Sequence, residues 1–401
     1  MTKSCVIGLG YIGLPTAGLL AASGHEVVGV DINDVIVGYI NAGKPHFEEK
    51  GLETLISTQV HAGNLKASNK PETADTFLII VPTPFFEADK SADMKYVRQA
   101  SKDISSFLVE GNLIILESTS ALGATKKDVM DVIHTERPEL LGRLHFAFCP
   151  ERAIPGNTLF ELENNDRVVG GVDEASTEKA VAYYQSFIQG EILPTSDKTA
   201  EMVKLCENAF RDVNIAYANE LSMICDKLGV DVWQVIKLAN HHPRVNILQP
   251  GPGVGGHCIA IDPWFIAAAA PNEAKLITQA RQINDSKPHW VAAKVQQAVA
   301  EIDKKDVTVG LLGLAFKPNV DDMRESPSLT VAHLIGEKVT ANIIACEPYI
   351  DDYKDIKIVA LDTLLEQADV IVMLTDHDAF KHITLAQLSG KKIIDTRGSF
   401  V

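Results

Sequence analysis

The sequence has little of what would mark a metalloprotein or a disulfide-rich protein. It contains six cysteines in 401 residues, and no two of them form a C-x-x-C pair. It also has no H-E-x-x-H motif or other metal-ligand spacing, and His241 and His242 precede a proline, as expected of a helix end or loop. We therefore predict no metal site and no disulfide framework, and scattered cysteines are typical of a reducing compartment.

Long apolar runs and an excess of positive charge are also missing. The longest strongly apolar stretch, residues 264–270, is far too short to cross a bilayer. The apolar segment 12–22 belongs to a glycine motif rather than to a secretory signal. The net charge is −16 with a pI of about 5.2, so global repulsion opposes nucleic acid and anionic membrane surfaces. We predict a cytoplasmic protein that binds neither, whereas an anionic small molecule needs only a local cluster of cations.

The N-terminal residues predict a dinucleotide site. A strand over residues 4–7 runs into a G-x-G-x-x-G motif, and a helical pattern follows it. The motif consists of Gly8, Leu9, Gly10, Tyr11, Ile12 and Gly13. Its first glycine makes the turn, the second admits a pyrophosphate, the third lets helix pack on strand, and the helix N-terminus favours the anion. A second strand, residues 25–30, ends in Asp31, which is placed to bind a ribose 2′-hydroxyl and favours NAD over NADP. Without a ligand, the same residues would make only a tight turn.

Strand and helix patterns alternate through the first half of the chain. Further apolar strand candidates are residues 77–81, 113–117, 146–149 and 168–170. This alternation predicts an α/β fold with a doubly wound sheet. Ligands of such sheets bind beyond the carboxyl ends of the strands, so the strand tails point to the cofactor crevice. These tails carry Thr83, Thr119, Glu151 and Arg152. Each of them also fits a simple helix cap or turn.

Residues 199–228 predict one long amphipathic helix. Their apolar side chains are spaced by three or four throughout, and Gly229 follows as a stop signal. Lys204 and Asn208 lie one turn apart on one face, where both side chains can donate hydrogen bonds to an oxyanion. A solvated polar face is the other interpretation of this pair. A helix of this length often joins domains or subunits, so we expect at least a homodimer.

The glycine-dense loop 251–262 carries one cysteine and, four residues later, one aspartate. Cysteines such as Cys5 and Cys346 lie in apolar strand-like runs and are expected to be core residues. Cys258 instead follows glycines, which let the backbone approach a ligand closely. We therefore predict that this loop holds the thiol of Cys258 against a ligand rather than burying it.

A third region begins near Val307 and repeats the strand and glycine-turn pattern. Its further strand candidates are residues 343–346, 370–374 and 392–395. With 46% hydrophobic and 22% charged residues, the chain is long enough for two or three domains. We predict two Rossmann-like doubly wound domains joined by a long central helix. The expected domains are 1–195 for NAD, 196–295 for the helix and the cysteine loop, and 296–401 for a nucleotide-linked substrate.

Together these motifs resemble the nucleotide-sugar 6-dehydrogenases of the UDP-glucose/GDP-mannose dehydrogenase family over nearly the whole chain. The resemblance rests on the glycine motif with Asp31, Thr83-Pro84, Ser118-Thr119, Pro150-Glu151-Arg152, Lys204 to Asn208, Gly255-Gly256-His257-Cys258 with Asp262, Phe316-Lys317-Pro318 and Arg324-Glu325-Ser326. Residues 240–248 and the cysteine loop are most similar to the branch that oxidises UDP-N-acetyl-D-mannosamine. His257 and Ile261 stand where the UDP-glucose branch usually carries serine and lysine, which argues against glucose.

The resemblance implies a four-electron oxidation of C6 with two NAD molecules in turn, giving a uronic acid for bacterial surface polysaccharides. Cys258 would form a thiohemiacetal and then a thioester, which water hydrolyses. Lys204 and Asn208 would stabilise oxygen-centred negative charge, and Asp262 would position or deprotonate the water. Thr119 and Glu151 resemble the water-holding and base residues of the family. The group that takes the first alcohol proton stays open.

The resemblance also implies how the ligands are held. Phe316 and Lys317 would bind the nucleotide end of a UDP-sugar, with Gly255 and Arg152 among the further substrate contacts. Arg244 would reach the sugar or phosphate from a partner subunit, and Arg324 would contact the cofactor phosphate. Both arginines also fit surface salt bridges.

Two other functions fit the same residues. One is a two-electron NAD alcohol dehydrogenase in which Cys258 is only structural. The other is a catalytically silent protein that binds NAD and a UDP-sugar, although the presence of Lys204, Asn208, Cys258 and Asp262 together argues against it.

Overall fold

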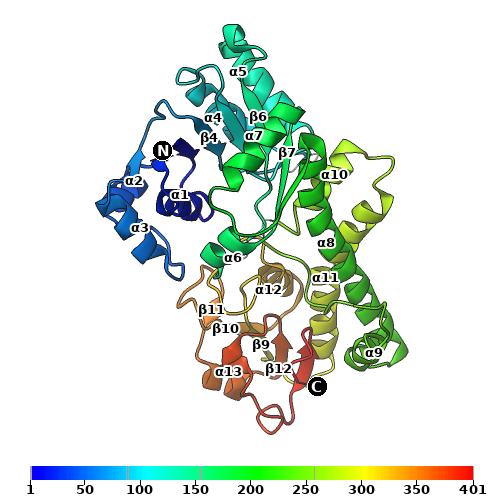
Figure 1. Ribbon diagram of the computed structural model, residues 1–401. Coiled ribbons are helices and arrows are strands. Elements are labelled where there is room, and N and C mark those ends of the chain that lie inside the picture. Colours follow the sequence, from blue (N-terminus) through cyan, green and yellow to red (C-terminus); the bar gives the residue numbers. More distant parts are fainter. Residues whose placement is uncertain (1, 87, 89, 154–155, 257, 401) are drawn as a thin grey trace. The chain divides into compact units, whose positions relative to one another are not determined.

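The computed structural model describes residues 2–86, 88, 90–153, 156–256 and 258–400. The chain divides into two compact units, one ending at Glu207 and the other beginning at Asn208. Both units contain a sheet of mostly or entirely parallel strands together with helices (Figure 1). The expected α/β class with Rossmann-like doubly wound sheets and a long helix is confirmed.

The first unit is built on an eight-stranded sheet with the order β3-β2-β1-β4-β5-β6-β7-β8. Neighbouring strands are parallel except β6 and β7, which are antiparallel. The strands are β1 (Lys3–Ile7), β2 (Glu26–Val30), β3 (Leu65–Ser68), β4 (Thr76–Ile79), β5 (Leu113–Leu116), β6 (His145–Phe148), β7 (Arg167–Gly171) and β8 (Ile192–Ser196). The helices are α1 (Gly13–Ala22), α2 (Asp34–Asn41), α3 (Leu52–His61), α4 (Lys95–Ser105), α5 (Asp131–Glu136), α6 (Thr158–Asn164) and α7 (Glu174–Tyr184), with a π-helix at Thr125–Met130 and a 3-10 turn at Pro138–Leu140.

The core of this unit lies on both faces of the sheet. Side chains of β1 alternate between two buried clusters, with Cys5 and Ile7 in one and Val6 in the other. Strands that are covered on both faces need apolar residues at every position, which is why they appear in the sequence as continuous apolar runs.

The second unit begins within the longest helix, α8 (Asp197–Leu228), and contains a five-stranded parallel sheet with the order β11-β10-β9-β12-β13. Its strands are β9 (Thr308–Leu312), β10 (Asn342–Cys346), β11 (Lys357–Ile358), β12 (Val370–Met373) and β13 (Lys392–Asp395). Its other helices are α9 (Val232–Ala239), α10 (Asp262–Ala269), α11 (Lys275–Ala300), α12 (Pro327–Lys338) and α13 (Leu361–Gln367), with a 3-10 turn at Asp378–Phe380.

The predicted long helix is confirmed almost to the residue. It begins two residues earlier than expected and ends at Leu228, before Gly229 with φ of +68°. No helix formed by the described residues is both long and apolar enough to cross a membrane.

Three strands, β3, β8 and β11, were not predicted. All three lie at edges of their sheets. In β3 the buried Leu65 and Ala67 alternate with the exposed Lys66, β8 contains Pro194, and β11 has only two residues. Edge strands need one partner and tolerate polar residues and proline, so they lack the continuous apolar pattern of central strands.

Candidate active site

Two glycines of the turn after β1 are closely packed, and a third faces open space. A Cβ on Gly8, whose φ is +97°, would lie 2.2 Å from the carbonyl oxygen of Ile80, and a Cβ on Gly13 would lie 1.8 Å from that of Gly8. Both residues must therefore be glycine for the turn to pack. A Cβ on Gly10 would meet no described atom within 4 Å. The protein itself does not require this glycine, so the open space fits close approach of a pyrophosphate.

Asp31 follows β2 and is bonded to the same turn. Its Oδ2 accepts the backbone N–H of Leu9 at 3.1 Å, and its Oδ1 accepts that of Asn33 at 2.9 Å. The next side chain, Ile32, is 90% exposed and offers an apolar surface beside the carboxylate. A carboxylate at this place suits a ribose 2′-hydroxyl and repels a 2′-phosphate. The residues present therefore fit NAD, with Gly8 to Gly13 and Asp31 holding it.

The carboxyl ends of β4 and β5 are joined by Ser118. Its Oγ donates to the carbonyl oxygen of Val81 at 2.8 Å and accepts the N–H of Val81 at 2.9 Å. Thr83 and Thr119 follow these ends, and both are half-buried. The two threonines thus extend from neighbouring strands at the edge of the sheet where ligands of such folds bind.

The corner after β6 connects Glu151 to the first turns of α8. The Lys204 ammonium donates to the carbonyl oxygen of Glu151, and Arg152 forms a 2.9 Å ion pair with Glu207. The Glu151 carboxylate accepts a 2.7 Å hydrogen bond from Arg167, which is the first residue of β7. The sequence analysis missed Arg167, although an arginine inside an otherwise apolar strand is a signal of a buried ion pair.

In the second unit the cysteine loop brings three predicted residues together. Cys258 is exposed, and its carbonyl oxygen accepts the N–H groups of Ile261 at 3.1 Å and Asp262 at 2.9 Å. Asp262 is buried as the first residue of α10, and its Oδ2 accepts a 2.6 Å hydrogen bond from the Asn208 amide. Asp262 is therefore fixed one turn from the cysteine backbone. His257 lies outside the described residues.

Glycines in this loop are required by close packing. A Cβ on Gly255 would lie 2.4 Å from the carbonyl oxygen of Glu325, and one on Gly256, with φ of +79°, would lie 2.9 Å from the Phe316 ring. The start of the loop is held by Asn219, whose Oδ1 accepts the N–H of Gly251 at 2.9 Å. The loop is therefore positioned by tertiary contacts on both sides of Gly253.

Asn219 belongs to a buried polar network between α8 and α11, which the sequence analysis also missed. The amide of Asn219 donates to Asn284 at 2.9 Å, and the amide of Asn284 donates to Asp212 at 2.8 Å. Asp212 also forms a 2.5 Å ion pair with Arg281. All four residues are at most 2% exposed. Because buried polar groups need partners, this network fixes the two helices in one register.

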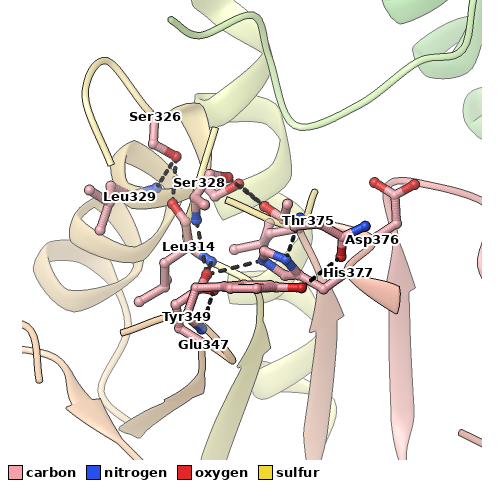
Figure 2. A network of polar contacts seen from close by, with 12 residues as sticks. Leu314, Ser326, Ser328, Leu329, Glu347, Tyr349, Thr375, Asp376 and His377 are labelled. Carbon is pink, nitrogen blue, oxygen red and sulfur yellow. Dashed lines mark hydrogen bonds and ion pairs between the residues drawn. The ribbon is translucent and has the colours of Figure 1, made fainter. Parts of the chain in front are cut away.

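The turn after β9 has its own carboxylate, Glu347, which follows β10 as Asp31 follows β2. Figure 2 shows that Glu347 is enclosed by partners, whereas Asp31 is half-buried. Its Oε2 accepts the N–H groups of Leu314 at 2.7 Å and Ala315 at 3.1 Å and lies 3.2 Å from Nε2 of His377. The N–H of Asn319 donates to Nδ1 of His377 at 2.9 Å, so Nε2 carries the proton.

Burial favours the neutral acid of Glu347, but hydrogen bonds from His377 and the turn outweigh it and lower the pKa of this carboxyl group. The Glu347 carboxylate thus binds the backbone N–H groups of the turn from its inner side. Thr375 completes the closure. Its hydroxyl donates to the carbonyl oxygen of Ala315 at 2.7 Å and lies 3.0 Å from the hydroxyl of Ser328 (Figure 2).

The second unit also carries the predicted contacts Phe316, Lys317, Arg324 and Arg244. Nζ of Lys317 lies 5.8 Å from the centroid of the Phe316 ring, and both residues are half-buried. Arg324 is exposed and its guanidinium pairs with Asp322 at 2.7 Å. Arg244 is exposed on the segment after α9. Across the described residues, no three His, Cys, Asp or Glu side chains are grouped so as to hold a metal ion.

Comparison with known proteins decides the family. Descriptions of the UDP-glucose/GDP-mannose dehydrogenase family match residues 2–188 as its NAD binding domain, 198–286 as its central domain and 310–400 as its UDP binding domain. The chain belongs to this family. The predicted family and the predicted cofactor NAD are confirmed, and the UDP binding domain supports a UDP-sugar substrate.

Relatives of this family member match along their whole length. The NDP-N-acetyl-D-galactosaminuronic acid dehydrogenase of Ralstonia nicotianae is 46% identical, over 98% of this chain and 95% of its own. The UDP-N-acetyl-D-mannosamine dehydrogenase of Escherichia coli K12 is 47% identical, over 98% of both chains. The solved UDP-N-acetyl-mannosamine dehydrogenase Cap5O of Staphylococcus aureus is 40% identical with a TM-score of 0.88, covering 100% of this chain and 96% of that one.

Proposed function

We propose that this dehydrogenase oxidises C6 of UDP-N-acetyl-D-mannosamine to UDP-N-acetyl-D-mannosaminuronate, with two NAD molecules consumed per sugar. The observation that carries the proposal is the fixed group of Cys258, Asp262 and Asn208 in a member of an NAD-binding nucleotide-sugar family. An exposed cysteine beside a buried, hydrogen-bonded carboxylate suits covalent oxidation of an aldehyde. A simple alcohol dehydrogenase needs no such pair.

Each residue has a role in this reaction. NAD, when bound, would supply the hydride acceptor, and the glycine turn with Asp31 would hold the cofactor. The Cys258 thiolate adds to C6 of the aldehyde, forming a C–S bond, and the thioester left after oxidation is cleaved when water attacks C6 and the thiolate departs. Asp262 orients and deprotonates that water, and Asn208 holds the carboxylate in place.

The residues of the first unit take the oxygen-centred charge and the protons. Lys204 stabilises the oxyanion, Glu151 acts as a base, and Thr119 holds a water. Lys204 donates to the backbone of Glu151, so the two groups are anchored to each other. Glu151, Arg152, Lys204, Asn208, Arg244, Gly255, Phe316 and Lys317 are the proposed substrate contacts, and Thr83, Thr119 and Arg324 join the glycine turn around NAD.

The identity of the sugar is the most specific part of the proposal. Relatives named for N-acetylmannosamine and for N-acetylgalactosaminuronic acid are almost equally similar to this chain. The test is an NADH absorbance assay of the purified protein with UDP-N-acetylmannosamine, UDP-N-acetylgalactosamine, UDP-N-acetylglucosamine and UDP-glucose in parallel. Two NADH per sugar and a carboxylate product from the first substrate support the proposal. One NADH with accumulated aldehyde would indicate the two-electron reaction, and binding without any NADH would indicate a silent binding protein.

A homodimer through α8 forms part of the proposal. Phe210, Tyr217 and Ile224 are 70%, 54% and 48% exposed and follow one another at intervals of seven residues. This spacing puts them on one stripe of the helix, which a second copy of the same helix can cover. Arg244 would then act in the site of the partner. Light scattering should give the mass of a dimer or larger oligomer, and Phe210→Asp with Ile224→Asp should reduce it.

The domain limits 1–195, 196–295 and 296–401 and a cytoplasmic location complete the proposal. We also expect no binding to nucleic acid or membranes, because the net charge of −16 opposes both. Limited proteolysis would test the domain limits, and cell fractionation would test the location.

A further inference from the structure

A buried arginine lies directly behind Glu151. The side chain of Arg167 is 3% exposed, its Nη1 donates to Oε2 of Glu151 at 2.7 Å, and its Nη2 donates to the carbonyl oxygen of Leu162 at 3.3 Å. The other carboxylate oxygen, Oε1, accepts the backbone N–H groups of Arg152 and Ala153. Both oxygens of Glu151 are therefore held from the protein side, and the orientation of the carboxylate depends on the guanidinium.

A second buried carboxyl group, Glu117, lies in the same cluster at the end of β5. It is 2% exposed, and its Oε1 accepts a hydrogen bond from the Tyr184 hydroxyl. Among the described residues, its Oε2 has no hydrogen-bond partner. Burial raises the pKa of Glu117 to about 7, although the positive charge of Arg167 opposes the increase. Cys149 is also buried in this cluster, beside Tyr184.

One guanidinium thus lies near two carboxyl groups and forms its ion pair with only one of them. A buried carboxylate without enough donors is costly, so one guanidinium suffices when it pairs with Glu151 and Glu117 holds a proton. We propose that Arg167 is a positioning residue for the oxidation. It fixes the carboxylate of Glu151 in one orientation, and Glu117 does not compete for the guanidinium. This inference rests on the proposed function, because it requires Glu151 to act on the substrate.

The test compares Arg167→Met and Arg167→Lys in the full-length protein. Loss of the guanidinium releases one Glu151 oxygen, so kcat of Arg167→Met should fall at least about 10-fold, the scale of a misplaced base. The KM for NAD should stay within about twofold, because the glycine turn is built from other strands. Lysine keeps the charge but loses the planar fork, so Arg167→Lys should recover part of kcat.

Two control variants separate this role from general packing. Arg143→Met removes an exposed arginine that pairs with the exposed Glu110 at 2.9 Å, and it should leave kcat unchanged. Glu117→Gln replaces a neutral acid with a neutral amide of the same shape, so its loss of kcat should stay below about threefold. Circular dichroism checks that each variant is folded. Should Arg167→Met not fold, Arg167→Lys carries the test through the same measurements of kcat and of the KM for NAD.

The outcomes are distinct. Unchanged kcat in folded Arg167→Met, with an active wild type, would overturn the inference alone. A Glu117→Gln loss as large as that of Arg167→Met would show that Arg167 serves Glu117 instead. A wild type that oxidises none of the UDP-sugars would overturn the proposed function and this inference with it.

Discussion

The amide of Asn208 donates a 2.6 Å hydrogen bond to Oδ2 of Asp262, and both side chains are buried. The two residues are 54 positions apart in the chain. This bond ties the cysteine loop to α8, so the position of the carboxylate next to Cys258 depends on a residue of the long helix.

Asn208→Ala should impair both stability and the second half of the reaction. Removing a donor from a buried carboxylate costs about 1–3 kcal/mol, which urea unfolding can measure. Asp262 would also lose its fixed orientation, so acid formation should fall at least about 10-fold. Asn214→Ala, at a half-buried position of the same helix, is the matched control. Equal activity of the two variants would contradict the proposed role of Asn208.

Cys258→Ala should abolish acid formation without affecting the cofactor. The variant lacks the sulfur atom that forms the proposed C–S bond, whereas the glycine turn and Asp31 lie in the other unit. NAD binding followed by fluorescence should stay within about twofold of wild type. Cys206→Ala removes the other exposed cysteine and should retain activity. Acid production by Cys258→Ala at the wild-type rate would rule out the covalent mechanism.

Gly10→Ala should weaken NAD binding, whereas Gly13→Ala should lower thermal stability. The new Cβ at position 10 meets no described atom, so the protein should fold with an unchanged Tm, but the methyl group would occupy ligand space. We expect NAD affinity to fall about 10-fold, equivalent to roughly 1.4 kcal/mol. At position 13 the Cβ would collide with the Gly8 carbonyl oxygen, so Tm itself should drop. Normal NAD affinity in Gly10→Ala would contradict the assigned pyrophosphate site.

Lys287 should make stability depend on pH in the alkaline range. This residue of α11 is 2% exposed, its ammonium donates to the Ser222 hydroxyl, and it lies 4.2 Å from the centroid of the Trp290 ring. Burial lowers its pKa from 10.5 to about 7, although Asp226 opposes the decrease. Between these two values the unfolded chain binds the proton and the folded chain does not, so the free energy of unfolding should rise with pH.

Lys287→Met should therefore flatten that rise, as urea unfolding at about pH 7, 8.5 and 10 would show. Lys294→Met is the control, because this neighbour is partly exposed and pairs with Asp226 at 2.5 Å. If wild type and Lys287→Met had the same slope against pH, the lowered pKa of Lys287 would be refuted.

Sequence periodicity predicted those parts of the fold that depend on neighbouring residues. The central strands, the glycine turn with Asp31 and the helix ending at Leu228 all follow from local spacing and from the special torsion angles of glycine. The edge strands β3, β8 and β11 escaped prediction, because a strand with one neighbour tolerates a mixed pattern, such as that of β3 beside β2.

The sequence named the candidate site residues, but the partners of their side chains followed from contacts between distant segments. Lys204 and Asn208 were expected to act as a pair, since they lie four residues apart on α8. The structure instead directs the Lys204 ammonium to the backbone of Glu151 and the Asn208 amide to Asp262. Spacing along a helix fixes the face of a side chain, but the choice of partner depends on which other segment packs there.

The sequence by itself determined the order of the motifs, and with it the family, the cofactor and the residue types available for the chemistry. Only the tertiary structure decided that Arg167 lies behind Glu151, that Asn219 holds the cysteine loop and that Glu347 closes its own turn. The physical reason is that a buried charge or amide is stable only with a partner. Such partners come from segments far apart in the chain, which local patterns do not record.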